Sequence, residues 1–266
     1  MEVNPFQPLF AFRCEEEVLP PAERLFLFLS PQHWIWATTD AHQQVLTLFH
    51  YSIPKVQGIE RAAALWQWHQ AALPSPPLAV ECVMAWEGSF PLPKALLVEQ
   101  DLPELYGHMV GDPKGIHFAR FEVNNQVEMA QAFPDLVWQA CKVYQAEAKL
   151  QHLSLSFGKS IWESSRSSLQ LGAYFFPGGM DVWLFQDQQL LLGNRFACEN
   201  VADFAYHLLN AAQQMGWSSR GDGLFVTGYE ERYDAIVALL RTYVKNIKAD
   251  EMTTDAVAQR MRLFSL

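Results

Sequence analysis

Two stretches of this chain place the same kinds of segment in the same order, and this repeat limits the folds open to it. In each stretch three apolar segments of strand length, separated by turn residues, precede an amphipathic segment of helix length and one more strand. The apolar segments cover residues 24–29, 33–38 and 45–51 in the first stretch, and 168–176, 180–186 and 189–196 in the second. The repeat predicts an α/β protein with two similar halves, each built from a sheet and helices.

The helix and the last strand of each stretch follow at matching distances. We expect helices at residues 59–73 and 200–215 and strands at 78–84 and 223–227, with corresponding elements offset by roughly 140 to 146 positions. The second helix ends at Gly216, because glycine readily takes the left-handed backbone conformation at a helix end. No residue-level identity survives across the offset, so the repeat is one of architecture rather than of sequence.

Further elements lie between and after the two stretches. Asn124-Asn125 predicts a turn between strands at residues 115–123 and 126–133. The remaining expected elements are a helix at 134–150, a strand at 152–157, a helix at 229–243 and a capped helix at 256–264. We therefore predict a first domain at residues 20–150, a second at 151–248, and a C-terminal helix or tail at 249–266.

The charge of the chain argues against nucleic acid and membrane lipid as partners. The sequence has 29 acidic and 19 basic side chains and a formal net charge of -10, which repels phosphate backbones and anionic lipid surfaces. No apolar run reaches the roughly 18 residues that a membrane-spanning helix needs. The first five residues lack the positive start and apolar centre of an export signal. These features predict a cytoplasmic protein without a membrane span.

The residue types that carry catalysis and metal binding do not fall into the arrangements that such sites need. The eight histidines include no His-x-x-x-His or His-Glu-x-x-His spacing, and the four cysteines form no Cys-x-x-Cys pair. The serine run at 164–168 lacks the Gly-x-Ser-x-Gly elbow that exposes a nucleophile, so we interpret it as a linker. Gly221-Asp222-Gly223 precedes a strand, which indicates a tight turn rather than a dinucleotide-binding loop. No catalytic or metal-ligating residue is predicted.

The tryptophans of the first half allow two interpretations. Trp34 and Trp36 lie on one face of the strand at 33–38 and apolar residues lie on the other, so both faces are expected to be covered. Core packing explains this pattern. The alternative is an aromatic contact patch for a partner protein, to which Trp66 and Trp68 would contribute.

Four segments carry a resemblance to a known family. They are FPLPKAL at 90–96, LLGNRF at 191–196, DFAYHLL at 203–209 and GLFVTGY at 223–229. With them the chain resembles, over residues 20 to 248, an uncharacterised bacterial family catalogued as a domain of unknown function. The order of elements is similar to that of the actin, sugar-kinase and heat-shock ATPase superfamily. This resemblance implies two ribonuclease H-like lobes around a cleft, and it implies no known activity.

The resemblance also directs attention to the two hairpin turns. In active members of the superfamily an Asp-x-Gly turn in each lobe holds phosphates and magnesium, and a Gly-Gly element holds the adenosine. The first-lobe turn at 29–33 has neither aspartate nor glycine and would hold a triphosphate poorly. The second-lobe turn at 177–181 keeps two glycines and a carboxylate, which a hairpin also needs for its own geometry. The candidates for nucleotide binding are Gly178, Gly179, Asp181, Thr227 and Gly228.

Functions from different classes remain open on this sequence. The first is a non-catalytic actin-like module that binds or scaffolds a protein partner, with a degenerate nucleotide site and no cofactor. The alternative is an ATPase that binds ATP and magnesium in the interlobe cleft through the five candidate residues. A third function, a hydrolase or transferase acting in the cleft, would need clustered acid–base residues, which a single sequence does not reveal. Fold alone does not choose among them.

Overall fold

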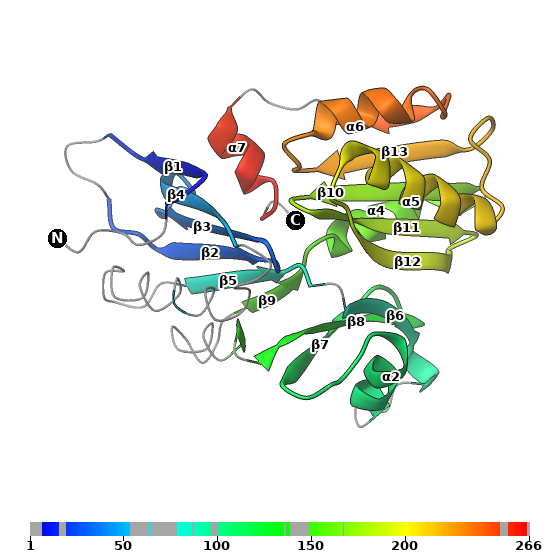
Figure 1. Cartoon of the computed structure of the whole chain (residues 1–266), viewed down its shortest axis with the longest axis horizontal. Helices are drawn as coiled ribbons and strands as arrows, with labels where there is room; N and C mark the ends of the chain where they lie inside the picture. The colour runs from blue at the N-terminus through cyan, green and yellow to red at the C-terminus, as the bar shows by residue number, and fades with distance from the viewer. Residues whose placement is uncertain are drawn as a thin grey trace. The chain divides into compact units, whose positions relative to one another are not determined.

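The computed structural model describes residues 7–15, 20–53, 64, 79–86, 88–96, 101–135, 137–138, 149–166, 168–250 and 255–264 (Figure 1). Most of the helices predicted at 59–73 and 134–150 lies outside these residues, as do Trp66 and Trp68. The chain divides into two compact units. Unit 1 is Met1–Trp86, Lys114–His117 and Phe133–Leu153, and unit 2 is Glu87–Pro113, Phe118–Ala132 and Ser154–Leu266.

Unit 1 is built on one six-stranded sheet with the order β1-β4-β3-β2-β5-β9. Its strands are β1 (Phe10–Arg13), β2 (Arg24–Leu29), β3 (His33–Thr39), β4 (Val45–Ser52), β5 (Ala79–Met84) and β9 (Lys149–His152). The pairs among β1 to β4 are antiparallel, whereas β2, β5 and β9 run parallel. Trp34 and Trp36 are each 4% exposed and Ile35 is fully buried, so both faces of β3 are covered as predicted.

Unit 2 contains a five-stranded sheet with the order β12-β11-β10-β13-β14. Its strands are β10 (Leu169–Phe176), β11 (Gly179–Gln186), β12 (Gln189–Ala197), β13 (Gly223–Gly228) and β14 (Ile247–Ala249). β10, β11 and β12 are antiparallel neighbours, and β10, β13 and β14 run parallel. This order matches β4-β3-β2-β5-β9 of unit 1 strand by strand. The predicted α/β repeat is therefore confirmed.

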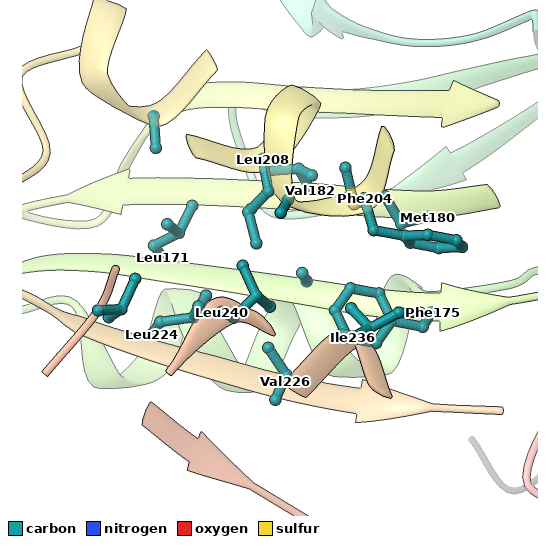
Figure 2. Packing of buried hydrophobic residues seen from close by; sticks show 14 of the residues in the cluster. Leu171, Phe175, Met180, Val182, Phe204, Leu208, Leu224, Val226, Ile236 and Leu240 are labelled. Carbon is teal, nitrogen blue, oxygen red and sulfur yellow. The ribbon is translucent and has the colours of Figure 1, made fainter. Parts of the chain in front are cut away.

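Helices α5 (Val201–Gln214) and α6 (Tyr233–Leu240) bury one face of this sheet (Figure 2). Phe204 and Leu208 from α5, and Ile236 and Leu240 from α6, are fully buried in one cluster with residues of β10, β11 and β13. Full burial of each such side chain contributes about 1.5–3 kcal/mol relative to exposure. The apolar stripe predicted for residues 200–215 thus forms the main core of unit 2.

Local sequence explains where α5 begins. The side-chain oxygen of Asn200 accepts hydrogen bonds from the backbone N–H groups of Ala202 and Asp203, and the Asp203 carboxylate accepts one from the backbone N–H of Asn200. This reciprocal capping box satisfies N–H groups that the first helical turn leaves without partners. The helix ends at the predicted glycine, since Gly216 has φ +83.

Helix α4 (Leu155–Ser164) packs on the opposite face of the sheet and corrects one prediction. The strand expected at 152–157 is wrong, because β9 ends at His152 and α4 starts three residues later. The alternation of Leu153, Ser154 and Leu155 resembles a strand, but packing against the sheet favours a helix here. A Cβ at Gly158 would come within 2.8 Å of the Trp183 ring, so glycine lets α4 approach the sheet closely. The serine run at 164–168 begins inside this helix rather than in a linker.

A three-stranded sheet with the order β6-β8-β7 completes the described fold. The elements here are β6 (Gly88–Pro93), η1 (Lys94–Leu96), α2 (Leu102–Met109), β7 (Ile116–Glu122) and β8 (Val127–Pro134). The predicted turn is present, with the Asn124 side chain accepting from the backbone N–H groups of Gln126 and Val127. Most of this sheet belongs to unit 2 although it falls within residues 20–150. The domain bounds 20–150 and 151–248 stay a prediction.

The C-terminal helix is shorter than expected. α7 (Ala256–Met261) begins after Asp255, whose carboxylate accepts from the backbone N–H groups of Val257 and Ala258. Arg260 joins it to the loop after β13, because its guanidinium lies 3.2 Å from the Glu231 carboxylate and over the Tyr229 ring. The predicted cap at Asp255 is therefore confirmed.

Candidate functional site

A row of polar side chains crosses the sheet of unit 2 near the carboxyl ends of β10 and β13. The strand register pairs Thr227 with Tyr174 and Tyr174 with Asp181. It also pairs Asp181 with Arg195 on β12. Residues paired across neighbouring strands point to the same face, so these four side chains form one row. In open α/β sheets ligands bind outside the carboxyl ends of parallel strands, which makes this edge the candidate functional site.

Asp250 extends the row to the far strand. Val226 pairs with Ala249 on β14, and the next residues along are Thr227 and Asp250. The Thr227 hydroxyl donates a hydrogen bond to the Asp250 carboxylate. Val226 belongs to the core under α5 and α6, so the polar row points to the opposite face, on which α4 packs. The row therefore spans all five strands on the α4 face.

Asp181 is held by partners on two other elements. Its carboxylate accepts hydrogen bonds from the Arg195 guanidinium at 2.5 and 2.7 Å and from the Ser154 hydroxyl at 2.6 Å. The Asp181 and Arg195 side chains are 4% and 2% exposed. The Ser154 hydroxyl in turn accepts from the Trp183 indole N–H at 2.9 Å. A bidentate pair so deeply buried uses the carboxylate for structure and fixes the start of α4 on the sheet.

The glycine turn between β10 and β11 is likewise engaged within unit 2. Gly178 has φ +85, and its carbonyl accepts from the backbone N–H of Cys198 at 2.9 Å. Its own N–H donates to the Glu230 carboxylate at 3.3 Å. The Glu230 side chain is 4% exposed and also accepts from Arg232 at 2.6 Å. Backbone N–H groups of a glycine turn are what an anion would use, and here a carboxylate of the protein is already bound to one.

Gly228 is required by close packing of two strands. It has φ +109, and a Cβ at this position would lie 2.1 Å from the Phe175 carbonyl oxygen. Phe175 is its register partner on β10. Gly179 is similarly restricted, because a Cβ there would come within 2.6 Å of the Phe196 carbonyl oxygen. Both glycines therefore have a structural explanation that does not involve a ligand.

The five predicted residues are thus brought to one edge of the sheet, where each has partners in the fold. Their proposed role in nucleotide binding stays a prediction. Sequence reasoning missed Ser154, Glu230 and Asp250, which bond to them. It also gave no role to Arg195, although the segment 191–196 was part of the resemblance. Alternation with Leu192 and Phe196, which pack on the α5–α6 core, places Arg195 on the other face of β12, and no local signal showed that this face is buried as well.

The corresponding turn of unit 1 is closed by hydrogen bonds of its own. The Ser30 hydroxyl donates to the His33 carbonyl at 3.0 Å, and the backbone N–H of His33 donates back to that hydroxyl at 2.9 Å. His33 Nδ1 lies 3.1 Å from Nε2 of the buried His50 on β4. Within the described residues no group of three or more His, Cys, Asp or Glu side chains is placed to hold a metal ion.

Burial keeps the hydroxyl groups of this region protonated. Burial raises the pKa of Tyr174 well above its usual range, with the nearby Asp181 carboxylate adding to the effect and the Arg262 guanidinium opposing it. The Tyr174 hydroxyl donates to the Arg262 carbonyl at 3.0 Å. Burial also raises the pKa of the Cys198 thiol to about 12, which excludes a reactive thiolate next to the glycine turn.

The aromatic patch suggested for the first half is not supported by the described residues. Trp34 and Trp36 are core side chains, so neither is accessible to a partner protein. No described helix is long and apolar enough to cross a membrane.

The sequence of this chain matches one known protein family. A family described as "Protein of unknown function (DUF3822)" matches residues 37–247, which is most of the chain. This chain belongs to the DUF3822 family. No curated protein matches the DUF3822 chain by sequence.

Solved structures show the fold of this DUF3822 protein. A Bacteroides thetaiotaomicron protein with an actin-like ATPase fold and unknown function aligns with a TM-score of 0.70 and 17% identity, covering 85% of this chain and 90% of that one. The PilM-PilN type IV pilus biogenesis complex aligns with a TM-score of 0.51 and 11% identity, covering 91% and 95%. The expected actin-like, ribonuclease H-like architecture is confirmed. At these identities the likeness concerns the fold.

Proposed function

We propose that this DUF3822 protein is a non-catalytic actin-like module that binds a protein partner in the cytoplasm. The observation that carries the proposal is the engagement of the Gly178 turn by Glu230. A phosphate oxygen approaching the Gly178 N–H would meet a buried carboxylate at the same position. Two negative charges at contact distance repel each other strongly away from water.

The state of Asp181 supports the same proposal. A carboxylate that helps to hold magnesium needs an oxygen free to bind the ion or one of its waters. Both oxygens of Asp181 accept hydrogen bonds from Arg195, and one of them also accepts from Ser154. Releasing Asp181 would leave a buried guanidinium without its partner, which costs about 3–5 kcal/mol. Magnesium binding at Asp181 would therefore compete with the packing of unit 2.

A protein of similar fold provides one example of function through a protein contact. One of the solved relatives in fold, PilM, is part of a complex with another protein, PilN. We propose that this DUF3822 protein likewise acts through a protein contact and needs no cofactor for it. The alternative is an ATPase in which Gly178, Gly179, Asp181, Thr227 and Gly228 hold ATP and magnesium.

A thermal-unfolding measurement with Mg·ATP separates the two functions. A ligand that binds only the folded state raises the melting temperature, and at 100 times its Kd it adds about 2.7 kcal/mol of stability. We expect millimolar Mg·ATP to leave the melting temperature of the wild-type chain equal to that with Mg·AMP. A rise with Mg·ATP but not with Mg·AMP, present in wild type and equally in the Asp222→Asn control, would contradict the proposal and favour the ATPase alternative.

The partner itself requires an experiment in the native cell. We expect the tagged chain, cross-linked at its native level of expression, to recover one protein in constant ratio across preparations. The tag alone serves as the control. Recovery of no such protein would contradict the binding function, whatever the outcome with Mg·ATP.

A further inference from the structure

A pocket of about 580 Å³ opens on the α4 face of the unit 2 sheet, beside the polar row. It is formed by α4, the ends of β10, β13 and β14, and the residue after α7. Its polar lining consists of Ser156, Ser160, Tyr174, Thr227, Lys248, Asp250 and Arg262. Its volume lies within the range of about 300–1,000 Å³ that is usual for small-molecule sites.

The floor of the pocket is apolar and partly aromatic. Phe157 and Ile161 contribute from α4, and Phe225 contributes from β13. Phe225 alternates with the core residues Leu224 and Val226, so its ring faces the pocket and not the α5–α6 core. A flat or aliphatic group placed on this floor would pack one face against the aromatic rings and keep its other face in water.

The rim of the pocket is positively charged in a chain that is acidic overall. The Lys248 ammonium lies 4.8 Å from the centroid of the Phe225 ring, which places it over the floor. Lys248 forms no ion pair with any described residue. The Arg262 guanidinium lies close enough to the Tyr174 hydroxyl to oppose the rise in its pKa. Against these two cations the lining holds one carboxylate, that of Asp250, which already accepts from Thr227.

Hydroxyl groups supply directional contacts around the same space. Ser156 is exposed in the first turn of α4, and Ser160 lies one turn further along the same helix. The Ser160 hydroxyl donates its proton to the Phe157 carbonyl, so in this arrangement it would need to rotate before it could donate to an anion. The pocket therefore combines an apolar floor, two cations and short hydroxyl side chains.

We propose that this pocket binds a small organic anion, with its carboxylate or similar group at Lys248 and its apolar body on the Phe225 floor. A single anionic group matches the Lys248 ammonium, which lies over the Phe225 ring and forms no ion pair with a described carboxylate. The apolar body is needed because inorganic anions gain nothing from the floor. This inference does not rest on the proposed function, since none of its contacts involves Gly178, Glu230 or Asp181, and of the nucleotide-binding candidates only Thr227 and Gly228 line the pocket.

Ligand-observed NMR with three probes of equal size tests the proposal. Benzoate, benzyl alcohol and benzylamine share one ring and differ in the charge of the attached group. We expect saturable binding of benzoate that is tighter than that of benzyl alcohol, and the weakest binding from benzylamine. Equal affinity for all three, or no saturable benzoate signal at millimolar concentrations, would overturn the proposal.

Two variants and a matched control locate the probe. Lys248→Gln should weaken benzoate about three- to five-fold, as expected for a solvent-exposed charge contact, while benzyl alcohol stays unchanged. Lys245→Gln changes an exposed lysine outside the pocket lining and should alter neither. Ser160→Phe should weaken both probes, because the larger ring fills the space above the floor. Benzoate binding that withstands both Lys248→Gln and Ser160→Phe would place the site elsewhere and refute the assignment.

Discussion

The carboxylate of Glu230 accepts a hydrogen bond from the backbone N–H of Gly178, so the loop after β13 is joined to the turn between β10 and β11. Both residues lie at the carboxyl edge of the unit 2 sheet, the edge at which open α/β sheets commonly bind ligands. A protein carboxylate at this position satisfies the turn without a ligand.

Replacement of Asp181 by Asn should strongly destabilise unit 2. The change leaves the Arg195 guanidinium, 2% exposed, without a charged partner, which costs about 3–5 kcal/mol. Chemical unfolding monitored by tryptophan fluorescence measures this loss. Asp187→Asn is the control, because Asp187 lies in an exposed hairpin turn and Asn tolerates its φ of +49.

A double replacement distinguishes an ion pair that stabilises from one that is only costly to break. Asp181→Leu combined with Arg195→Met removes both charges together, and we expect it to recover most of the stability lost in Asp181→Asn. If the double variant is as unstable as the single one, the Ser154 contact rather than the ion pair carries the stability. Ser154→Ala then provides the direct comparison.

Replacement of Gly228 by Ala should destabilise the contact between β10 and β13. The new Cβ would lie 2.1 Å from the Phe175 carbonyl oxygen, and the φ of +109 is one that alanine rarely adopts. We expect a loss of at least about 2 kcal/mol, from strain and from the shift that the strands must make. Gly221→Ala has open space around the added methyl group and should be nearly neutral. Equal stability of the two variants would contradict the close approach of the strands.

Alkaline pH should unfold the protein through its buried tyrosines. Burial raises the pKa of Tyr233 from 10.0 to about 12, and it raises those of Tyr174 and Tyr229 further. Below pH 10 these groups are neutral in both states, so the free energy of unfolding does not depend on them. Above pH 10 the unfolded state loses protons that the folded state keeps, and stability falls as pH rises toward 12.

The slope of stability against pH provides the measurement. Tyr233→Phe should make the loss between pH 10 and 12 less steep, even though it also removes the hydrogen bond to the Val226 carbonyl. Tyr243→Phe changes a side chain that is 57% exposed and should leave the slope unchanged. An identical slope in all three proteins would show that Tyr233 ionises as freely as an exposed tyrosine.

Most of the fold was predictable because its signals are local. The strand expected at 24–29 is β2 with the same bounds, and the helix expected at 200–215 is α5, which is followed by the predicted Gly216 at φ +83. Prediction failed at 152–157, where a short serine and leucine alternation fits a strand and a helix equally well. Only the packing of Gly158 on Trp183 decides that case, and that contact joins distant segments.

The candidate site was predictable in its residues but not in its chemistry. The glycines and the carboxylate of a hairpin turn are visible in a sequence, and Gly178 and Asp181 were found from the turn at 177–181. The partners that define their role come from far along the chain, because Glu230 lies 52 residues from Gly178 and Ser154 lies 27 from Asp181. No local sequence pattern connects such distant positions. Only the structure therefore shows that the Glu230 carboxylate accepts the hydrogen bond of the Gly178 N–H.

The melting temperature in phosphate, compared with chloride at equal ionic strength, tests the role of Glu230 most directly. In wild type the carboxylate at Gly178 opposes an added anion, so the difference between the two salts should be only the general stabilising effect of phosphate on a folded protein. Glu230→Ala frees the Gly178 N–H and the Arg232 Nε–H, while Arg232 keeps its hydrogen bond to the Glu199 carbonyl. Phosphate should then raise the melting temperature of this variant by about 2–4 °C more than that of wild type, equivalent to roughly 1 kcal/mol. Glu163→Gln, an exposed change on α4, should behave as wild type. A phosphate-dependent rise in wild type as large as that in Glu230→Ala would contradict the account.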